Sequence, residues 1–173
     1  MKKQILYPKF IPRLFATTID LVILSIILTP IMNFISRYIF VYLFHQFFIE
    51  YKINIADNKA LAESLKSSEF LAYASNSGGT FLSYVAISFA INVVLMGIYF
   101  VFFWYKFRAT PGKMIMRMRI VDAQDYSSSI SIYRFCKRFC GYVTSFIGIF
   151  GMIMRKNGQA THDKIARTIV IKV

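Results

Sequence analysis

The chain has 173 residues, of which 57% are hydrophobic, and its formal net charge is +13. One domain, residues 1–173, is expected at this length. Long apolar blocks with 18 Phe and 11 Tyr are typical of an integral membrane protein rather than of a soluble domain. The basic residues lie beside the apolar blocks, which favours anionic lipid headgroups over nucleic acid as their partners. The chain has only two histidines and two cysteines, so we expect no metal site and no disulfide framework. No cofactor is expected either.

The first apolar block, about residues 13–36, is long enough to cross roughly 30 Å of hydrocarbon as a helix. Pro8 and Pro12 interrupt any signal-peptide core and suit the first turn of a permanent anchor, and Pro30 predicts a kink near its far end. Residues 37–51 are rich in aromatic side chains, and continuing the first helix through them would make it far longer than the bilayer is thick. We therefore expect a separate helix there, lying at the membrane interface.

Residues 52–79 predict a polar loop outside the cytoplasm, with charges of both signs. Asp57 predicts the N-cap of a short helix that runs to Phe70, and SNSGG at 75–79 predicts a flexible end. The second span is expected at about residues 80–107.

Small and aromatic side chains mark two places in this second span. Ala86 and Ala90 form a small-xxx-small pair that permits close helix contact. Trp104 and Tyr105 predict the membrane interface at its far end.

The polar segments after the second span predict a small β-ribbon on the cytoplasmic side. MRMRIVD at 116–122 alternates in polarity, and RTIVIKV at 167–173 is rich in β-branched residues. Both patterns are typical of strands, so we expect the two segments to pair.

The third apolar segment, about residues 132–154, is short for a membrane span. Its opening turns carry three basic residues, and the uncharged part from residue 139 covers only about 24 Å as a helix. A re-entrant or interfacial helix is therefore favoured, with a full crossing as the alternative. Cys136 and Cys140 share one face of this helix; we expect packing thiols, with palmitoylation as the alternative.

The distribution of Lys and Arg predicts the orientation. Seventeen of the 21 lie at the N-terminus, in residues 106–138 and in residues 155–173, whereas residues 37–79 hold four, matched by four acids. The positive-inside rule places the N-terminus and residues 106–138 in the cytoplasm. The favoured re-entrant or interfacial third helix keeps the basic C-terminus there as well, whereas a full crossing would send it outside. The membrane is expected to be the bacterial plasma membrane. The expected fold is an all-α integral membrane protein with two transmembrane helices, a third re-entrant or interfacial helix, and the small ribbon.

An acidic side chain lies within the first span. Arg13 and Asp20 are about two helical turns apart and share a face with Thr17. An ionised aspartate at this depth costs roughly 2.5–3.5 kcal/mol, so Asp20 must face protein or water and needs a partner.

Three segments together resemble the RDD family of small membrane proteins: PRLFATTID, RATPGKMIMRMRIVDAQD and GQATHDKIARTIVIK. The resemblance covers nearly the whole chain and implies two membrane-spanning helices and a suspected role in transport. By position, it assigns the family's arginine and two aspartates to Arg13, Asp20 and Asp163. The chain departs from the family pattern at Met116 and Arg117, where a small or glycine-containing turn is expected.

The shared side of the membrane predicts that Asp163 pairs with Arg13, in a bidentate contact. Thr161 is expected to cap the short helix that follows it. His162, beside Asp163, is interpreted as a loop histidine, with a proton relay near neutral pH as the alternative. We expect Asp20 to face water or a basic residue, with three candidates: Arg134, Arg138 and Lys164.

Two classes of function fit these features. The first is transport of a small ion or solute by the Arg/Asp/Asp cluster, alone or as a subunit of a transporter, which requires a homo-oligomer or other membrane proteins to complete a path. The alternative is a non-transporting accessory or scaffold protein in which the cluster is a structural lock. An enzyme is not expected, because no nucleophile–base pair, metal cluster or cofactor loop is recognisable.

Overall fold

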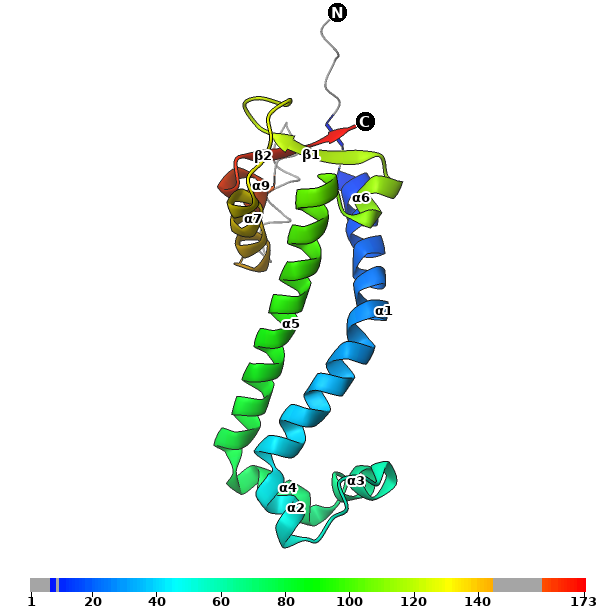
Figure 1. Ribbon diagram of the computed structural model, residues 1–173, viewed down its shortest axis with the longest axis vertical. Coiled ribbons are helices and arrows are strands. Elements are labelled where there is room, and N and C mark those ends of the chain that lie inside the picture. Colours follow the sequence, from blue (N-terminus) through cyan, green and yellow to red (C-terminus); the bar gives the residue numbers. More distant parts are fainter. Residues whose placement is uncertain (1–6, 9, 145–159) are drawn as a thin grey trace, which may run out of the picture. The chain divides into compact units, whose positions relative to one another are not determined.

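The computed structural model describes residues 7, 8, 10–144 and 160–173 (Figure 1). In chain order its elements are α1 (Phe10–Leu43), α2 (His45–Glu50), α3 (Asn58–Ser64), α4 (Ser68–Asn76), α5 (Gly78–Phe107), α6 (Pro111–Ile115), β1 (Met118–Asp122), α7 (Ile132–Thr144), α9 (Thr161–Ile165) and β2 (Thr168–Lys172). They form two compact units. We call Met1–Ile26 with Leu95–Val173 the ribbon unit, and Ile27–Val94 the aromatic unit.

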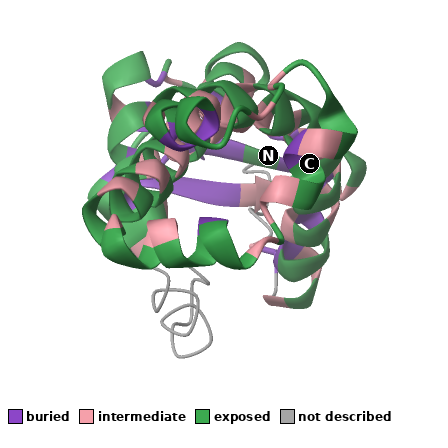
Figure 2. Cartoon of the chain, turned by 90° about the horizontal axis from the view of Figure 1, so that it is seen from below, coloured by how far each residue is buried: buried purple, intermediate pink, exposed green. Residues whose placement is uncertain are grey.

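By length and composition, α1 and α5 are candidates for crossing a membrane. They have 34 and 30 residues, and their most apolar windows have mean hydropathies of 2.1 and 2.3. Most large apolar side chains along both helices are exposed, and most of the helical ribbon is green in Figure 2. An apolar surface on this scale is unusual for a soluble protein. The two helices therefore suggest a membrane protein.

The predicted end of the first helix is wrong. α1 continues unbroken to Leu43, about 51 Å at 1.5 Å per residue, because no glycine or proline interrupts residues 37–43 and because its last turns have their own packing partners. Phe40 stacks on Phe44 and also contacts Tyr84. Helix geometry is therefore kept beyond the length that the bilayer requires.

The rest of the aromatic stretch contributes three phenylalanines to a buried core. Phe44, Phe47 and Phe48 are each at most 1% exposed and pack with Leu61 and Phe70. The ring centroids of Phe47 and Phe70 are 5.2 Å apart, and such aromatic pairs add about 0.5–1.5 kcal/mol each beyond their buried area. A separate helix is present there as α2, which begins only at His45 and contributes Phe47 and Phe48 to the core of the aromatic unit.

Two N-caps divide the predicted loop into two helices. The Asp57 carboxylate accepts from the Lys59 amide at 2.8 Å, which confirms the predicted cap. The helix does not run to Phe70, however, because α3 ends at Ser64 and Ser67 caps a new helix, its hydroxyl accepting from the Phe70 amide at 3.1 Å. The flexible end predicted at residues 75–79 is also wrong, because α4 reaches Asn76 and α5 begins at Gly78.

The helix predicted at about residues 80–107 is confirmed as α5, which begins slightly earlier than expected, at Gly78. Its small residues Ala86 and Ala90 are both exposed. The prediction that Trp104 lies at the membrane interface is wrong, because this residue is fully buried in the ribbon unit. Its neighbour Tyr105 is 60% exposed. Of this aromatic pair, only Tyr105 has the exposure that an interface anchor needs.

The predicted ribbon is confirmed. β1 and β2 pair antiparallel, from Met118 opposite Lys172 to Asp122 opposite Thr168 (Figure 1). Ile120 is fully buried, and most other residues of the strands are buried as well. An isolated two-stranded ribbon is marginal in water, so this burial gives it the support that it needs.

Turns beside the ribbon place arginines in the left-handed region. The φ angles of Arg108, Arg117 and Arg167 are 55°, 51° and 51°. The Arg117 turn lies where the family pattern called for a small or glycine-containing turn. The chain therefore keeps the turn and accepts a conformation that L-residues disfavour.

The third helix begins as predicted, at Ile132, and α7 is described to Thr144. The rest of the predicted third segment, from residue 145, lies outside the described residues. Gly141 serves a close approach, because a Cβ there would lie 3.2 Å from His162 of α9. Cys136 and Cys140 are both exposed, so the expectation that they are packing thiols is wrong.

Candidate functional site

A buried ion cluster joins three distant segments in the ribbon unit. Nη1 of Arg13, in the first turns of α1, donates to Oδ2 of Asp163 at 3.1 Å. Nη2 of Arg138, from α7, pairs with the other oxygen, Oδ1. Asp163 and Arg138 are both fully buried. The predicted contact of Arg13 with Asp163 is confirmed. It is not the bidentate contact that was expected, because the other terminal nitrogen of Arg13 donates to the Val170 carbonyl at 3.3 Å. The second oxygen of Asp163 pairs with Arg138 instead.

Local helix geometry fixes the position of Asp163. The residue is in the first turn of α9, and its Oδ2 accepts from the amide of Ala160 at 3.3 Å. Ala160 is the N-cap, so the prediction that Thr161 caps this helix is wrong. Burial raises the pKa of the Asp163 carboxyl, but the positive charges around it, that of Arg138 first, lower it more, so its pKa lies below the usual range. Asp163 is therefore a carboxylate at neutral pH.

Arg138 connects the ion cluster to the ribbon and to α5. Its Nη1 donates to the Thr168 hydroxyl of β2 at 2.6 Å. Its guanidinium carbon lies 5.1 Å from the centroid of the Trp104 ring, within the range of cation–π attraction. A buried arginine needs such partners, since an unpaired buried charge costs several kcal/mol.

Asp20 has neutral partners. It is 1% exposed, and its Oδ1 accepts from the Gly112 amide at 2.8 Å while its Oδ2 accepts from the Thr110 hydroxyl. Both donors belong to the TPGK turn that opens α6. The prediction that Asp20 faces water or a basic residue of the third apolar segment is therefore wrong.

Gly112 allows this contact because the turn lies directly against α1. A Cβ on Gly112 would lie 2.1 Å from the Ala16 carbonyl oxygen and 3.0 Å from Cγ of Asp20. Only glycine fits such a separation. The glycine of TPGK is thus a packing residue that lets a backbone amide reach a carboxylate.

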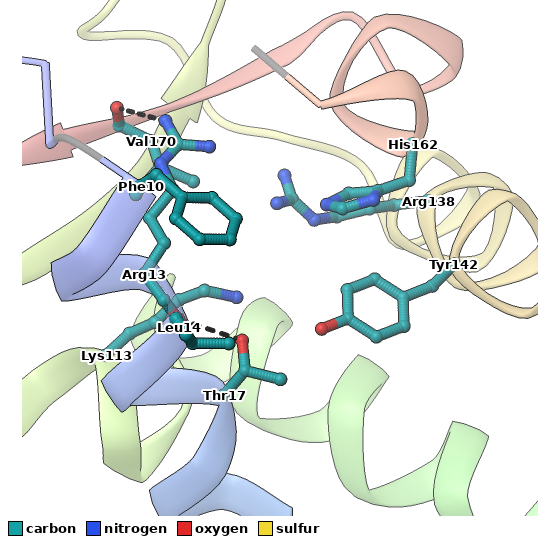
Figure 3. A pocket seen from close by; sticks show the side chains of 9 residues that line it. All are labelled: Phe10, Arg13, Leu14, Thr17, Lys113, Arg138, Tyr142, His162 and Val170. Carbon is teal, nitrogen blue, oxygen red and sulfur yellow. Dashed lines mark hydrogen bonds between the residues drawn. The ribbon is translucent and has the colours of Figure 1, made fainter. Parts of the chain in front are cut away.

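A small cavity of about 50 Å³ adjoins the ion cluster (Figure 3). Lys113 of α6 reaches it with only 7% exposure, and its Nζ lies 5.5 Å from the centroid of Trp104. Burial first, and then Arg138, lower the pKa of Lys113 to about 7. The polar and charged lining comes from α1, α6, α7 and α9: Arg13, Thr17, Lys113, Arg138, Tyr142 and His162.

Comparison with known proteins places this chain in a family. The RDD family model matches residues 7–167. This chain belongs to the RDD family. It is 39% identical over 175 residues, 99% of each chain, to the uncharacterized protein RP437 of Rickettsia prowazekii (strain Madrid E). No solved structure matches.

The three residues that the resemblance singled out, Arg13, Asp20 and Asp163, thus make two separate contacts here. Arg13 and Asp163 meet in the ion cluster, whereas Asp20 binds the α6 turn and is not part of the cavity lining. Thr17, between them on α1, donates to the Arg13 carbonyl at 3.0 Å and also lines the cavity.

The other candidates of this RDD chain have separate roles. Arg134 pairs with Asp122 at the end of β1 and donates to the Ala166 carbonyl at 3.0 Å. Lys164 is exposed. His162 lies against Tyr142, with ring centroids 4.6 Å apart. Burial first, and then Arg138, lower the pKa of His162 to about 3, so it is neutral near pH 7 and a relay there would have to start from the neutral ring.

Sequence reasoning missed Thr110, Gly112, Lys113 and Trp104. The TPGK motif was the available signal for three of them, but it was used for family resemblance and not for chemistry. Among the described residues, no group of three or more His, Cys, Asp or Glu side chains is placed to hold a metal ion.

Proposed function

We propose that this RDD protein is a component of a membrane transport system that handles a small ion or solute, with the cavity beside the ion cluster as its binding site. The single observation that carries the proposal is the position of Lys113, a nearly buried cationic residue that lines a cavity next to Arg138. Charged side chains kept at such cost beside membrane helices mark ion and solute paths.

The proposed setting is the bacterial plasma membrane, with both termini in the cytoplasm. The concentration of Lys and Arg near the ends of the chain and in residues 106–138 supports this orientation. Two candidate spans do not enclose a path by themselves. The proposal therefore includes a homo-oligomer or other membrane proteins as partners, and anionic lipid headgroups beside the basic segments.

The second candidate is an accessory or scaffold protein in which the charges are a structural lock. The contacts of Asp20 favour it: both carboxylate oxygens are bound within the protein, by a hydroxyl and a backbone amide. A carboxylate satisfied in this way fastens α6 to α1 and needs no solute.

One reconstitution separates the two candidates. The purified full chain is placed in liposomes, and chloride, proton and sodium flux are each followed with an entrapped dye. Transport predicts flux in the wild type and at least a tenfold loss in Lys113→Met, which removes the ammonium group and keeps an unbranched side chain only one heavy atom shorter. Absence of flux of all three ions in the wild type would rule out their transport by this chain without a partner protein and would favour the lock.

Two variants control this experiment. Lys106→Met changes an exposed lysine of α5, whose Nζ lies over the Phe102 ring, and should keep the wild-type flux. Asp20→Asn tests the lock: the amide keeps an acceptor for Gly112, so a change of flux without loss of folding would place Asp20 in the path. Loss of folding in Asp20→Asn would instead support the structural role.

A further inference from the structure

Lys113 is a nearly buried cation with no anionic partner among the described residues. No carboxylate oxygen of the described chain lies within 4 Å of its Nζ and no hydrogen bond holds it there; its contact is the face of Trp104, 5.5 Å away. An ammonium removed from water without a partner is strongly disfavoured. The site thus lacks, within the described residues, the anion that would complete it.

Arg138 supplies a second unsatisfied donor at the same cavity. Its terminal nitrogens contact Asp163 and Thr168, but its Nε has no hydrogen-bond acceptor among the described residues. Figure 3 shows the Lys113 ammonium of α6 and, from α7, the Arg138 guanidinium and the Tyr142 hydroxyl directed toward one space. Hydrogen-bond donors that converge on a cavity suit an anion.

The charges around the cavity balance without an anion only while Lys113 is neutral. Asp20 and Asp163 offset two guanidinium groups, those of Arg13 and Arg138, and His162 is neutral. Lys113 is then the remaining positive charge when it is protonated. Its pKa of about 7 follows from burial and from Arg138, and a bound anion would raise that pKa.

The size of the cavity selects the class of ligand. Its volume of about 50 Å³ exceeds the roughly 10–15 Å³ that one water requires, but it is far below the roughly 300–1,000 Å³ of sites for drug-sized ligands. A monatomic anion or a few waters fit, whereas a nucleotide or a sugar phosphate does not.

We infer that this cavity binds a small inorganic anion of about the size of chloride, held by Lys113, Arg138 and the Tyr142 hydroxyl, with a proton taken up at Lys113 as the anion binds. This inference names the solute class of the proposed function and rests on that proposal for its biological role. The binding itself does not require that the anion cross a membrane.

Trp104 provides the test, because it is the one tryptophan of the chain, is fully buried and lies against both cations. Bromide quenches indole fluorescence at short range, and the Trp104 ring centroid lies 5.5 Å from Nζ of Lys113 and 5.1 Å from the guanidinium carbon of Arg138, two groups that line the cavity. Bromide therefore replaces gluconate at constant ionic strength with the purified full chain in neutral detergent. We expect saturable quenching that chloride reverses by competition. Quenching that rises linearly with bromide and ignores chloride would overturn the inference.

Matched variants locate the site. Lys113→Met should weaken bromide binding at least tenfold, Tyr142→Phe several-fold, and Lys106→Met not at all. A blue-shifted Trp104 emission in each variant reports that the fold persists. If Lys113→Met does not fold, Tyr142→Phe decides alone, and wild-type affinity in that variant would contradict the assigned binding groups.

The proton gives a second readout. Below about pH 7 the affinity should be nearly constant, and above it the affinity should fall by up to tenfold per pH unit, because binding then requires proton uptake. The groups that face Lys113 are those of α1, α7 and α9: Arg13, Asp20, Arg138, Tyr142, His162 and Asp163. A bromide affinity that does not change between pH 6 and 9 would show that Lys113 is not one of the binding groups.

The source of the anion is separated with lipid nanodiscs. If anionic phosphatidylglycerol discs displace bromide and chloride does not, the occupant is a lipid headgroup and the inference is wrong. Saturable chloride-sensitive binding without flux in liposomes would leave the anion site standing and remove only the proposed transport. Flux without saturable binding would support transport and remove the anion site.

Discussion

At the scale of single residues, Asp163 is the most consequential side chain of the ion cluster. It is fully buried between Arg13 and Arg138. Removing the carboxylate leaves two guanidinium groups without their anion in a region that water does not reach. Breaking a buried ion pair in this way is far more costly than losing an exposed one.

We predict that Asp163→Ala destabilises the protein by about 3–5 kcal/mol. Chemical unfolding in detergent, followed by Trp104 emission, measures the change. Asp125→Ala is the matched control: this exposed carboxylate only accepts local bonds from Ser127, and its loss should cost less than about 1 kcal/mol. Equal losses of unfolding free energy in the two variants would show that the buried ion cluster stabilises the protein no more than an exposed carboxylate does.

Lys113 predicts how stability depends on pH. Its pKa is lowered from 10.5 in the unfolded chain to about 7 in the folded one. The unfolded state therefore binds more protons between these values, and stability must rise with pH across this window. In gluconate buffer, we expect the melting temperature to rise from pH 7 to pH 9.5 in the wild type and not in Lys113→Met. A parallel rise in both would assign the effect to another group.

At the scale of elements, the short α6 turn is held to α1 by backbone proximity. Gly112→Ala would place a methyl group against the Ala16 carbonyl. We expect a loss of about 1–3 kcal/mol, as for other overpacked contacts, together with a weakened bond to Asp20. Gly79→Ala, in α5, meets nothing within 4 Å and should be neutral or slightly stabilising. A neutral Gly112→Ala would show that the contact can relax.

The turn before β1 predicts a stabilising change. Arg117 is exposed and has a φ of 51°, a conformation that costs an L-residue roughly 1–2 kcal/mol and glycine almost nothing. After the larger entropy that glycine loses on folding, Arg117→Gly should gain about 0.5–1 kcal/mol in unfolding experiments. Arg119→Gly, inside the strand, should instead destabilise. Gain in both or in neither would contradict this account of the turn.

Elements followed from the sequence where one local pattern dominated. Alternation in 116–122 and the β-branched run in 167–173 were enough to predict the ribbon. The end of the first helix was missed because bilayer thickness was taken as the limit, although helix length in 37–43 depends on the packing of Phe40 and Phe44. Local patterns do not reveal such tertiary partners.

At the scale of the whole molecule, charge reasoning found one contact and missed another. The pair of Arg13 and Asp163 was predictable, because opposite charges on the same side of a membrane attract. The partner of Asp20 was not, because it includes a backbone amide, and every residue except proline has one. The burial of Trp104 was missed for a similar reason: its cationic partners come from α6 and α7, far away in the sequence.

The proposed orientation predicts a labelling pattern. In a Cys136→Ser, Cys140→Ser background, Lys164→Cys should react with an impermeant maleimide only in inverted vesicles, and Lys59→Cys only in right-side-out vesicles. Both lysines are exposed, so access depends on the side of the membrane. Reaction of both variants in the same vesicles would contradict two crossings with cytoplasmic termini.

The sequence separation of 150 positions from Arg13 to Asp163 has a consequence for biosynthesis. At about 5–20 residues per second, the ribosome needs roughly 8–30 seconds to deliver the aspartate after the arginine has been made. During that interval the nascent helix carries a cation whose counter-ion does not yet exist. A chaperone or an insertase that shields the first helix for tens of seconds would meet this need, and chains that stall before the end would be natural targets for membrane proteases.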